Sequence, residues 1–167
     1  MPIIDSLLPE YDHEMSVTRK LLERVPEQDF TWKPHEKSSS LGALAAHLAN
    51  IPTWVDWTLD KDCFDMDALP ADARPGLPAG RAQVLERFDK NVSSARAKMA
   101  SKTDGELLTP WTFKAGGRVV FTMPKVAVLR SFVMNHTIHH RGQLSVYLRL
   151  RDVPLPMMYG PTADEAM

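Results

Sequence analysis

The sequence SFVMNHTIHHRGQLSVY, residues 131–147, contains three histidines within five residues of a long helical pattern. At about 100° per residue, His136 and His140 lie about 40° apart on the predicted inward stripe of this helix. His139 falls on the edge of that stripe and is expected to point to its flank. Two imidazoles one turn apart on a buried face are costly to desolvate unless they bind something. A divalent metal ion is the simplest such partner.

Helical periodicity extends on both sides of this stretch. Apolar side chains recur at steps of three and four in four segments, which we expect to be helices: Asp5–Val25, Ser40–Leu59, Arg81–Ser101 and Pro124–Arg151. Ser40 is a suitable N-cap for the second helix. Pro52 is expected to kink that helix, because proline cannot donate a hydrogen bond to the carbonyl of Leu48.

The connections differ from the helices in composition. Lys61–Gly80 is rich in Asp, Ala and Pro, which predicts a long loop. Two short apolar runs between Thr109 and Met123 flank Gly116-Gly117, which predicts a β-hairpin. The tail from Val153 contains three prolines and is expected to lie extended over the helices. We therefore expect an all-α fold: one domain over residues 1–167, built as a four-helix bundle, with a long connection between helices two and three and a short β-hairpin before helix four.

Composition narrows the function classes. The chain has 167 residues and a net charge of −1, so it lacks the basic surface that nucleic acid or an anionic membrane would require. A single cysteine, Cys63, excludes an internal disulfide framework and fits a reducing cytoplasm, where we expect the protein to act. We expect no signal peptide at Met1–Leu8 and no membrane span.

A third histidine, His47, lies on the inward stripe of the second predicted helix. Together His47, His136 and His140 would supply three neutral nitrogen ligands from two helices, leaving an open position as catalytic zinc sites do. Such ligands do not neutralise a divalent ion, which favours ionisation of a bound water or thiol. Imidazole ligands suit Zn, Ni, Fe and Cu alike, so these residues by themselves do not select the metal. The alternative is that each imidazole is simply hydrogen-bonded in the core.

The residues around this set limit the chemistry. Thr137 stands where the HExxH metalloprotease motif requires its glutamate, so that reaction is excluded. Tyr11 and Gln143 could contact ligands or substrate, and Trp54 could wall the pocket, although packing explains each of them equally well. Arg141 lies about 140° from the first histidine of the pair and is expected to pair at the surface or at an interface. No catalytic acid or base is predicted.

Three stretches carry a resemblance that covers essentially the whole chain: SLGALAAHLANIPTW (residues 40–54), HTIHHRGQLSVYLRL (136–150) and VPLPMMYGPTADE (153–165). They resemble the DinB/YfiT-like family of metal-binding four-helix bundles. The resemblance implies that His47, His136 and His140 bind Zn or Ni and that the protein is a homodimer. Asp152 stands where such sequences often have glycine, and aspartate tolerates the left-handed geometry that a helix end can require.

Members of that family include thiol-dependent enzymes such as bacillithiol S-transferases and the mycothiol-dependent maleylpyruvate isomerase. The resemblance therefore implies a metal-dependent enzyme, in the first place a thiol S-transferase, whose partners are a small-molecule substrate and a low-molecular-weight thiol. Family membership does not fix the reaction. Two other functions stay open: a hydrolase that uses metal-bound water, and a metal-binding, stress-related homodimer without turnover.

Overall fold

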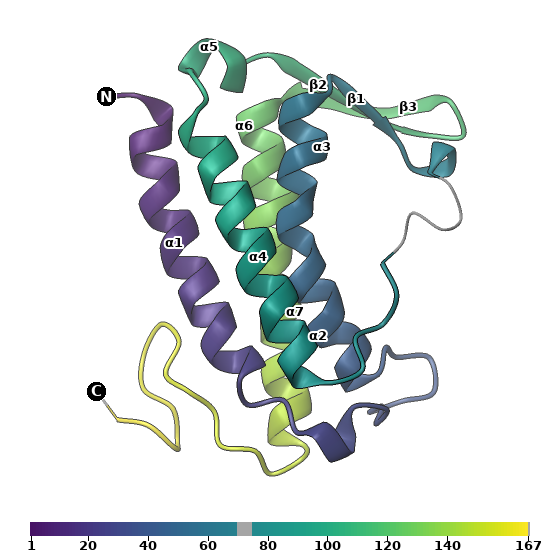
Figure 1. Ribbon diagram of the computed structural model, residues 1–167, viewed down its shortest axis with the longest axis vertical. Coiled ribbons are helices and arrows are strands. Elements are labelled where there is room, and N and C mark those ends of the chain that lie inside the picture. Colours follow the sequence, from purple (N-terminus) through teal and green to yellow (C-terminus); the bar gives the residue numbers. More distant parts are fainter. Residues whose placement is uncertain (70–74, 167) are drawn as a thin grey trace.

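The structure, a computed structural model, describes residues 1–69 and 75–166 (Figure 1). Its described helices are α1 (Ile3–Leu22), α2 (Leu41–Asn50), α3 (Trp54–Asp60), α4 (Arg81–Ala100), α5 (Asp104–Leu107), α6 (Lys125–Val128) and α7 (Asn135–Arg149). Shorter 3₁₀ turns span Glu27–Asp29, Ile51–Thr53 and Met66–Ala68, and a π-helical segment spans Leu129–Met134. The first predicted helix therefore begins two residues earlier and ends three residues earlier than expected.

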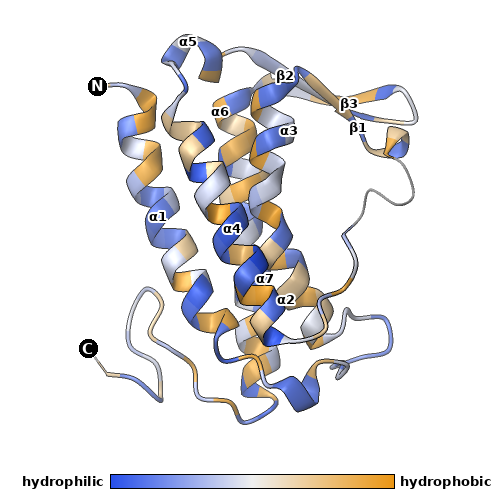
Figure 2. Ribbon diagram, viewed as in Figure 1, coloured by the Kyte–Doolittle hydropathy of each residue, from blue (hydrophilic) through white to orange (hydrophobic). Residues whose placement is uncertain are grey.

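The long helices pack side by side around one apolar interior. Both α1 and α2 pack against α4 and α7 (Figure 1). Figure 2 shows hydrophobic and hydrophilic residues alternating along the long helices, as amphipathic helices require. Leu21, Leu48 and Leu144 are fully buried, and Phe88 is 1% exposed. Since burying one such side chain contributes about 1.5–3 kcal/mol, this interior is the main source of folding energy.

The second predicted helix is divided at the predicted proline. The Ser40 hydroxyl accepts a hydrogen bond from the Ala43 backbone N–H at 3.1 Å, so Ser40 is the N-cap of α2 as expected. After α2 ends at Asn50, Pro52 lies in the 3₁₀ turn that leads into α3. The prediction of a kink is confirmed, because proline lacks the N–H that a continuous helix would use.

The last helix departs from the predicted uniform pattern. Its middle, Leu129–Met134, is π-helical, which inserts about one extra residue and rotates the preceding residues by about 100° relative to those that follow. The buried residues of α7 are Thr137, Arg141, Leu144 and Leu148. At about 100° per residue, the centre of this buried face lies about 110° around the helix from His136. We had expected the buried face to lie closer to His136. The predicted phase was therefore wrong, and the histidine pair lies on the edge of the buried face.

A small sheet crosses one end of the helices (Figure 1). The predicted hairpin is present as β2 (Pro110–Ala115) and β3 (Arg118–Pro124), and its turn residues Gly116 and Gly117 have φ of 57° and 73°. A third strand, β1 (Cys63–Asp65), pairs in parallel with β2 inside the region predicted as a loop. Three residues are too few for a periodic signal. The fold is therefore helix-rich, as expected, and its small sheet has one strand more than the predicted hairpin. Residues 70–74 of the predicted loop lie outside the described residues.

The C-terminal tail returns along α1 and α7 (Figure 1). Asp152 begins it with φ of 56°, the left-handed geometry expected where the resembling sequences carry glycine. Arg149 of α7 pairs with Asp164 of the tail, and Arg24 pairs with Glu165 at 2.7 Å. These exposed pairs contribute little individually, but together they hold the tail against the helices. Among the described helices, none has the length and apolar character that a membrane span needs.

Candidate metal centre

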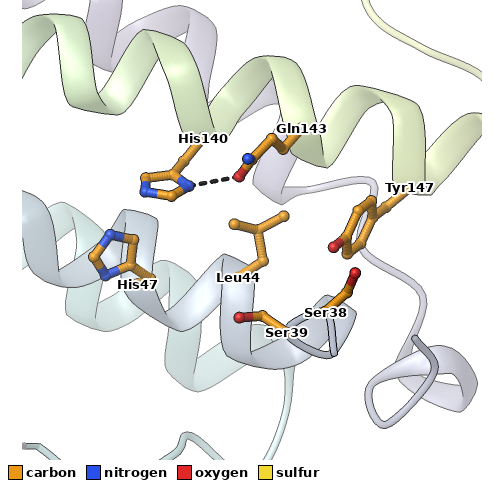
Figure 3. A pocket seen from close by; sticks show the side chains of 7 residues that line it. All are labelled: Ser38, Ser39, Leu44, His47, His140, Gln143 and Tyr147. Carbon is orange, nitrogen blue, oxygen red and sulfur yellow. Dashed lines mark hydrogen bonds between the residues drawn. The ribbon is translucent and has the colours of Figure 1, made fainter. Parts of the chain in front are cut away.

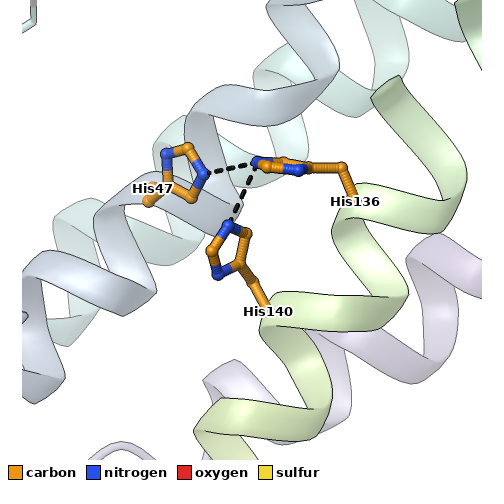
Figure 4. Close-up of side chains that lie close together, drawn as sticks. All are labelled: His47, His136 and His140. Atoms are coloured by element: carbon orange, nitrogen blue, oxygen red, sulfur yellow. Dashed lines mark hydrogen bonds between the residues drawn. The ribbon is translucent and has the colours of Figure 1, made fainter. Parts of the chain in front are cut away.

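His47 from α2 and His136 and His140 from α7 converge between the two helices (Figure 4). The Nε2 atom of His136 lies 3.0 Å from Nε2 of His47 and 3.0 Å from Nε2 of His140. One ring nitrogen from each of the three residues lies within 4.8 Å of the others. Two helices that run side by side thus bring together all three residues that the sequence singled out.

The donor set fits a divalent metal ion. Two nitrogens that each lie about 2.1 Å from one ion, at 90–110° to each other, are about 3.0–3.4 Å apart. The Nε2 separations of 3.0 Å fall at the lower end of that range. All three side chains are half-buried, so one side of the cluster remains open. Three imidazole ligands with an open side are typical of catalytic rather than structural zinc sites.

The protonation of the cluster also suits metal binding. Burial, and then the neighbouring charge of His140, lower the pKa of His47 to about 4. Burial, and then the charges of the other histidines, lower the pKa of His136 to about 4. Burial lowers the pKa of His140 as well, although its hydrogen bond with Gln143 opposes that change. At neutral pH the imidazoles of His47 and His136 are therefore uncharged and present lone pairs, the form that binds a metal.

Gln143 orients one of the imidazoles. Its Oε1 lies 2.7 Å from Nδ1 of His140, and its Nε2 donates to Nε2 of His139 at 3.1 Å. With the amide assigned this way, Nδ1 of His140 carries the proton and Nε2 keeps its lone pair toward the cluster. The sequence suggested Gln143 as a neighbour of the site, and the structure confirms that position. His139 is exposed and lies on the flank of the cluster, as expected.

The open side of the cluster faces a pocket of about 270 Å³ between α2 and α7 (Figure 3). The side chains that line it are Ser38, Ser39, Leu44, His47, His140, Gln143 and Tyr147. Figure 3 shows Tyr147 and Ser38 at one end and the two imidazoles at the other. Within the described part of the chain, no carboxylate lines this pocket. Its polar groups are neutral hydroxyls and an amide, apart from the imidazoles themselves.

Of two other residues that the sequence suggested near the site, Trp54 lies beside the histidines and Tyr11 lies away from them. The Trp54 ring lies 5.0 Å from the His136 ring and 5.8 Å from the His47 ring, so it packs against the cluster, but it is not among the residues that line the pocket. Tyr11 is fully buried, and its hydroxyl donates to the carbonyl oxygen of Val92 in α4 at 3.4 Å. Burial raises the pKa of the Tyr11 phenol. Tyr11 therefore belongs to the packing between α1 and α4 rather than to the metal cluster.

Arg141 does not pair at the surface as predicted, because the π-helical segment changes which face of α7 is buried. It is 1% exposed and pairs with Glu14 of α1 at 2.7 Å. Its Nη1 also donates to the Glu14 carbonyl oxygen at 3.0 Å and to the Thr18 hydroxyl at 3.2 Å. The Tyr159 hydroxyl donates to the Glu14 carboxylate at 2.7 Å. We call Glu14, Arg141 and Tyr159 the Arg141 cluster.

The sequence analysis did not identify this cluster. A usable signal existed on α1, where Glu14 lies four residues before Thr18 and next to Met15 on an otherwise apolar face. A carboxylate at such a position needs a charged partner, because an unpaired buried charge is very costly. Arg141 on α7 could have been identified as the partner of Glu14, but we expected it to lie at the surface.

Comparisons with known proteins agree with this fold. The DinB family model matches residues 4–166. A protein of Bacillus subtilis (strain 168) named "Uncharacterized protein YrdA" is 25% identical over 170 residues, covering 97% of this chain and 91% of that protein.

Solved structures resemble it too. A DinB-like protein from Bacillus cereus ATCC 10987 superposes with a TM-score of 0.75 at 21% identity, over 95% of this chain and 98% of that one. The DinB-like protein YjoA from Bacillus subtilis gives 0.67 at 20% identity, over 97% of this chain and 99% of that one. These two likenesses concern the fold. Because the family model covers nearly the whole sequence, the chain belongs to the DinB family.

Proposed function

We propose that the protein binds one divalent metal ion through His47, His136 and His140 and uses it to activate a low-molecular-weight thiol for transfer to a small-molecule electrophile. Zn or Ni is the proposed ion, with Fe or Mn as alternatives that imidazole ligands also accept. The observation that carries the proposal is the open, uncharged three-imidazole cluster at one end of a pocket of about 270 Å³.

The bound ion would act as a Lewis acid with open positions and lower the pKa of a thiol placed there. The chain's own residues prepare that position. Gln143 keeps the lone pair of His140 directed at the cluster, and Trp54 covers the side next to His136 and His47. Because all three ligands are neutral, they leave the positive charge of the ion available to a thiolate.

The lining of the pocket favours a thiol over water as the activated group. A hydrolase generally needs a positioned acid or base to move protons during attack and departure of the leaving group. Within the described residues, the pocket wall offers no carboxylate for that role. A thiolate, once formed, is already a strong nucleophile and needs no further base. Hydrolysis and a non-catalytic, stress-related role are the competing outcomes.

We further propose that the chain is one domain with a four-helix-bundle core and that it acts in the cytoplasm as a homodimer. The resemblance to the DinB/YfiT-like family supports the bundle and the dimer, and the single cysteine supports the compartment. Light scattering at tens of micromolar tests the dimer. A monomeric mass would contradict it.

The experiment that tests the function begins with elemental analysis of protein purified from metal-replete cells. About one divalent ion per chain is expected. The loaded protein is then given 1-chloro-2,4-dinitrobenzene with bacillithiol, mycothiol, glutathione or cysteine in turn, and thioether formation is followed by absorbance. Wild type and His139→Ala should turn over at least one thiol, whereas His47→Ala should not. Turnover of an ester or amide panel without thiol transfer would support the hydrolase. No turnover of either kind would support the non-catalytic role.

A further inference from the structure

The pocket beside the metal cluster has two chemically different ends. His47 and His140 lie at one end, and Tyr147 and Ser38 lie at the other (Figure 3). We infer that this second end, the hydroxyl end, binds a thiol whose far end is an uncharged hydrogen-bonding group, such as an amide or a hydroxyl, in preference to a carboxylate. The inference rests on the proposed function for the place of the thiol sulfur, and it adds Tyr147 and Ser38 as residues that determine specificity.

Tyr147 lies on the same face of α7 as His140. It follows seven residues later, so the two side chains are about 20° apart around the helix and about 10 Å apart along it. On α2, the buried Leu44 lies one turn before His47 and gives the pocket an apolar side between its two ends. A ligand that contacts both ends must therefore span about two helical turns.

The hydroxyls at this end differ from the others of their kind in the protein. The chain has three tyrosines, and the hydroxyls of Tyr11 and Tyr159 each donate a hydrogen bond to an acceptor within the protein. The Tyr147 hydroxyl has no such partner among the described residues, and Figure 3 marks no hydrogen bond between it and Ser38. Both hydroxyls line the pocket, so both can donate to a ligand or accept from it.

The Tyr147 ring is held in place by a second aromatic residue. The Trp32 ring lies 5.8 Å from it, at 88° between the two planes, which is the edge-to-face arrangement that aromatic pairs favour. Both rings are half-buried and pack against the apolar core. A hydroxyl on a ring that is already fixed loses little conformational entropy when a ligand binds, so Tyr147 is preorganised for this contact.

The side chains around the hydroxyl end offer a carboxylate no cationic partner. Within the described residues, no lysine or arginine lines the pocket. The Arg151 guanidinium lies 5.5 Å from the Trp32 ring centre, behind the pocket wall, but it pairs with Asp29 at 2.9 Å. Lys37 is exposed beside the equally exposed Glu36, and neither lines the pocket. An anionic group bound here would therefore lack a compensating charge.

The N-terminus of α2 does not supply an anion site either. Free N–H groups in the first turn of a helix bind anions readily. Here each of the first three has an acceptor within the protein: the Leu41 N–H donates to the Trp32 carbonyl oxygen at 2.9 Å, the Gly42 N–H to the Phe30 carbonyl oxygen at 2.9 Å, and the Ala43 N–H to the Ser40 hydroxyl at 3.1 Å. A carboxylate would lose hydration without gaining a cation or a helix N–H, whereas an amide or hydroxyl is much less costly to desolvate.

Binding of two matched thiols tests the inference without chemistry. 6-Mercaptohexanamide and 6-mercaptohexanoate have the same length and nearly the same shape, but they differ in charge at the far end. Isothermal titration calorimetry of the zinc-loaded protein should give about tenfold tighter binding of the amide, which corresponds to about 1.4 kcal/mol. 2-Mercaptoacetamide and 2-mercaptoacetate are too short to reach Tyr147 and should not show this preference.

Two variants assign the preference to the hydroxyl end. Tyr147→Phe and Ser38→Ala each remove one hydroxyl, so each should weaken binding of 6-mercaptohexanamide about fivefold and leave that of 6-mercaptohexanoate within about twofold. Ser145→Ala is the matched control: Ser145 lies about 160° from Tyr147 around α7, and its hydroxyl donates to the Gly142 carbonyl oxygen at 2.7 Å. Circular dichroism and elemental analysis confirm that each variant is folded and metal-loaded.

The outcomes separate this inference from the proposed function. Equal affinity of wild type for the two long thiols, or an unchanged preference in both Tyr147→Phe and Ser38→Ala, would overturn the inference even in a protein that transfers thiols. The expected preference in a protein that transfers no thiol to 1-chloro-2,4-dinitrobenzene would support the inference and overturn the proposed reaction alone. Failure of all four thiols to bind the zinc-loaded protein would overturn both.

Discussion

His140 and Arg141 are adjacent in the sequence and serve opposite purposes. His140 is half-buried, and its Nε2 lies 3.0 Å from Nε2 of His136 in the three-imidazole cluster. Arg141 is 1% exposed and has a carboxylate, a carbonyl and two hydroxyls as partners. The comparison teaches that a buried charge paired with a carboxylate stabilises the fold, whereas half-buried ring nitrogens that converge on one point can bind a ligand.

The sharpest test of this contrast is Arg141→Ala. It would leave the Glu14 carboxylate buried without its cation, and breaking a buried pair in this way costs about 3–5 kcal/mol. Urea unfolding should register that loss, while the metal content of the remaining folded protein should stay near one ion per chain. Arg149→Ala removes an exposed partner of Asp164 and should cost less than about 1 kcal/mol. Equal losses in the two variants would contradict the structural role of Arg141.

His140→Ala should have the inverse effect. Two neutral imidazoles seldom hold a divalent ion, so we expect affinity to fall at least about 100-fold, or about 2.7 kcal/mol of binding energy. Stability of the metal-free protein should change little, because His140 lies at the edge of the core. Competition titration with a chromophoric chelator measures the affinity, and urea unfolding of the apo form measures the stability. Retained tight binding would remove His140 from the ligand set.

Removal of the metal tests, without any mutation, whether the histidine cluster contributes to the stability that the Arg141 cluster and the core provide. The apolar interior and the Arg141 cluster persist in the absence of the ion, so the helical circular dichroism signal should be retained after chelation. The free energy of unfolding should fall only by the binding contribution, about 2.7 kcal/mol at a free metal concentration 100 times Kd. Collapse of the helical signal on chelation would show that the ion, rather than the core, holds the helices together.

Acid should affect the metal-free protein through the histidines. The pKa of His47 and that of His136 are about 4 in the folded chain, against about 6.5 when unfolded. Between these values the unfolded chain binds more protons, so stability should decrease as pH falls from about 6.5 to about 4. The loss should be modest because the imidazoles are half-exposed, and it should shrink in a His47→Ala, His136→Ala double variant. Urea unfolding across this range checks it; an unchanged slope in the double variant would assign the effect to other groups.

The smallest expected effect belongs to His139→Ala. Its imidazole is exposed, contacts Gln143 and packs against the edge of the His140 ring at 4.9 Å, but it contributes no nitrogen to the cluster. The change should therefore alter metal affinity by no more than about tenfold. The same competition titration, run beside His140→Ala, compares the two neighbours directly. If the His139 variant lost the ion and the His140 variant kept it, His139 rather than His140 would be the metal ligand.

The residues that could be predicted from sequence are those with short-range signals. Spacing of three and four residues identified His136 and His140, and Gly116-Gly117 identified the hairpin. The π-helical segment has neither proline nor glycine to reveal it, so a uniform helix gave the wrong face for Arg141. Strand β1 depends on parallel pairing with residues about 50 positions away, which no local pattern records.

The Arg141 cluster affects the order in which native contacts can form while the chain is being synthesised. Glu14 leaves the ribosome early, while the Tyr159 hydroxyl that caps its carboxylate is 145 residues further along. The Glu14 carboxylate therefore gains its native partners only after α7 and then the tail have been synthesised. Contacts of such long range close late and slow the search for the native state. A ribosome that stalls between residues 149 and 159 would hold a chain whose described helices are all synthesised but whose Glu14 carboxylate still lacks the hydrogen bond from Tyr159.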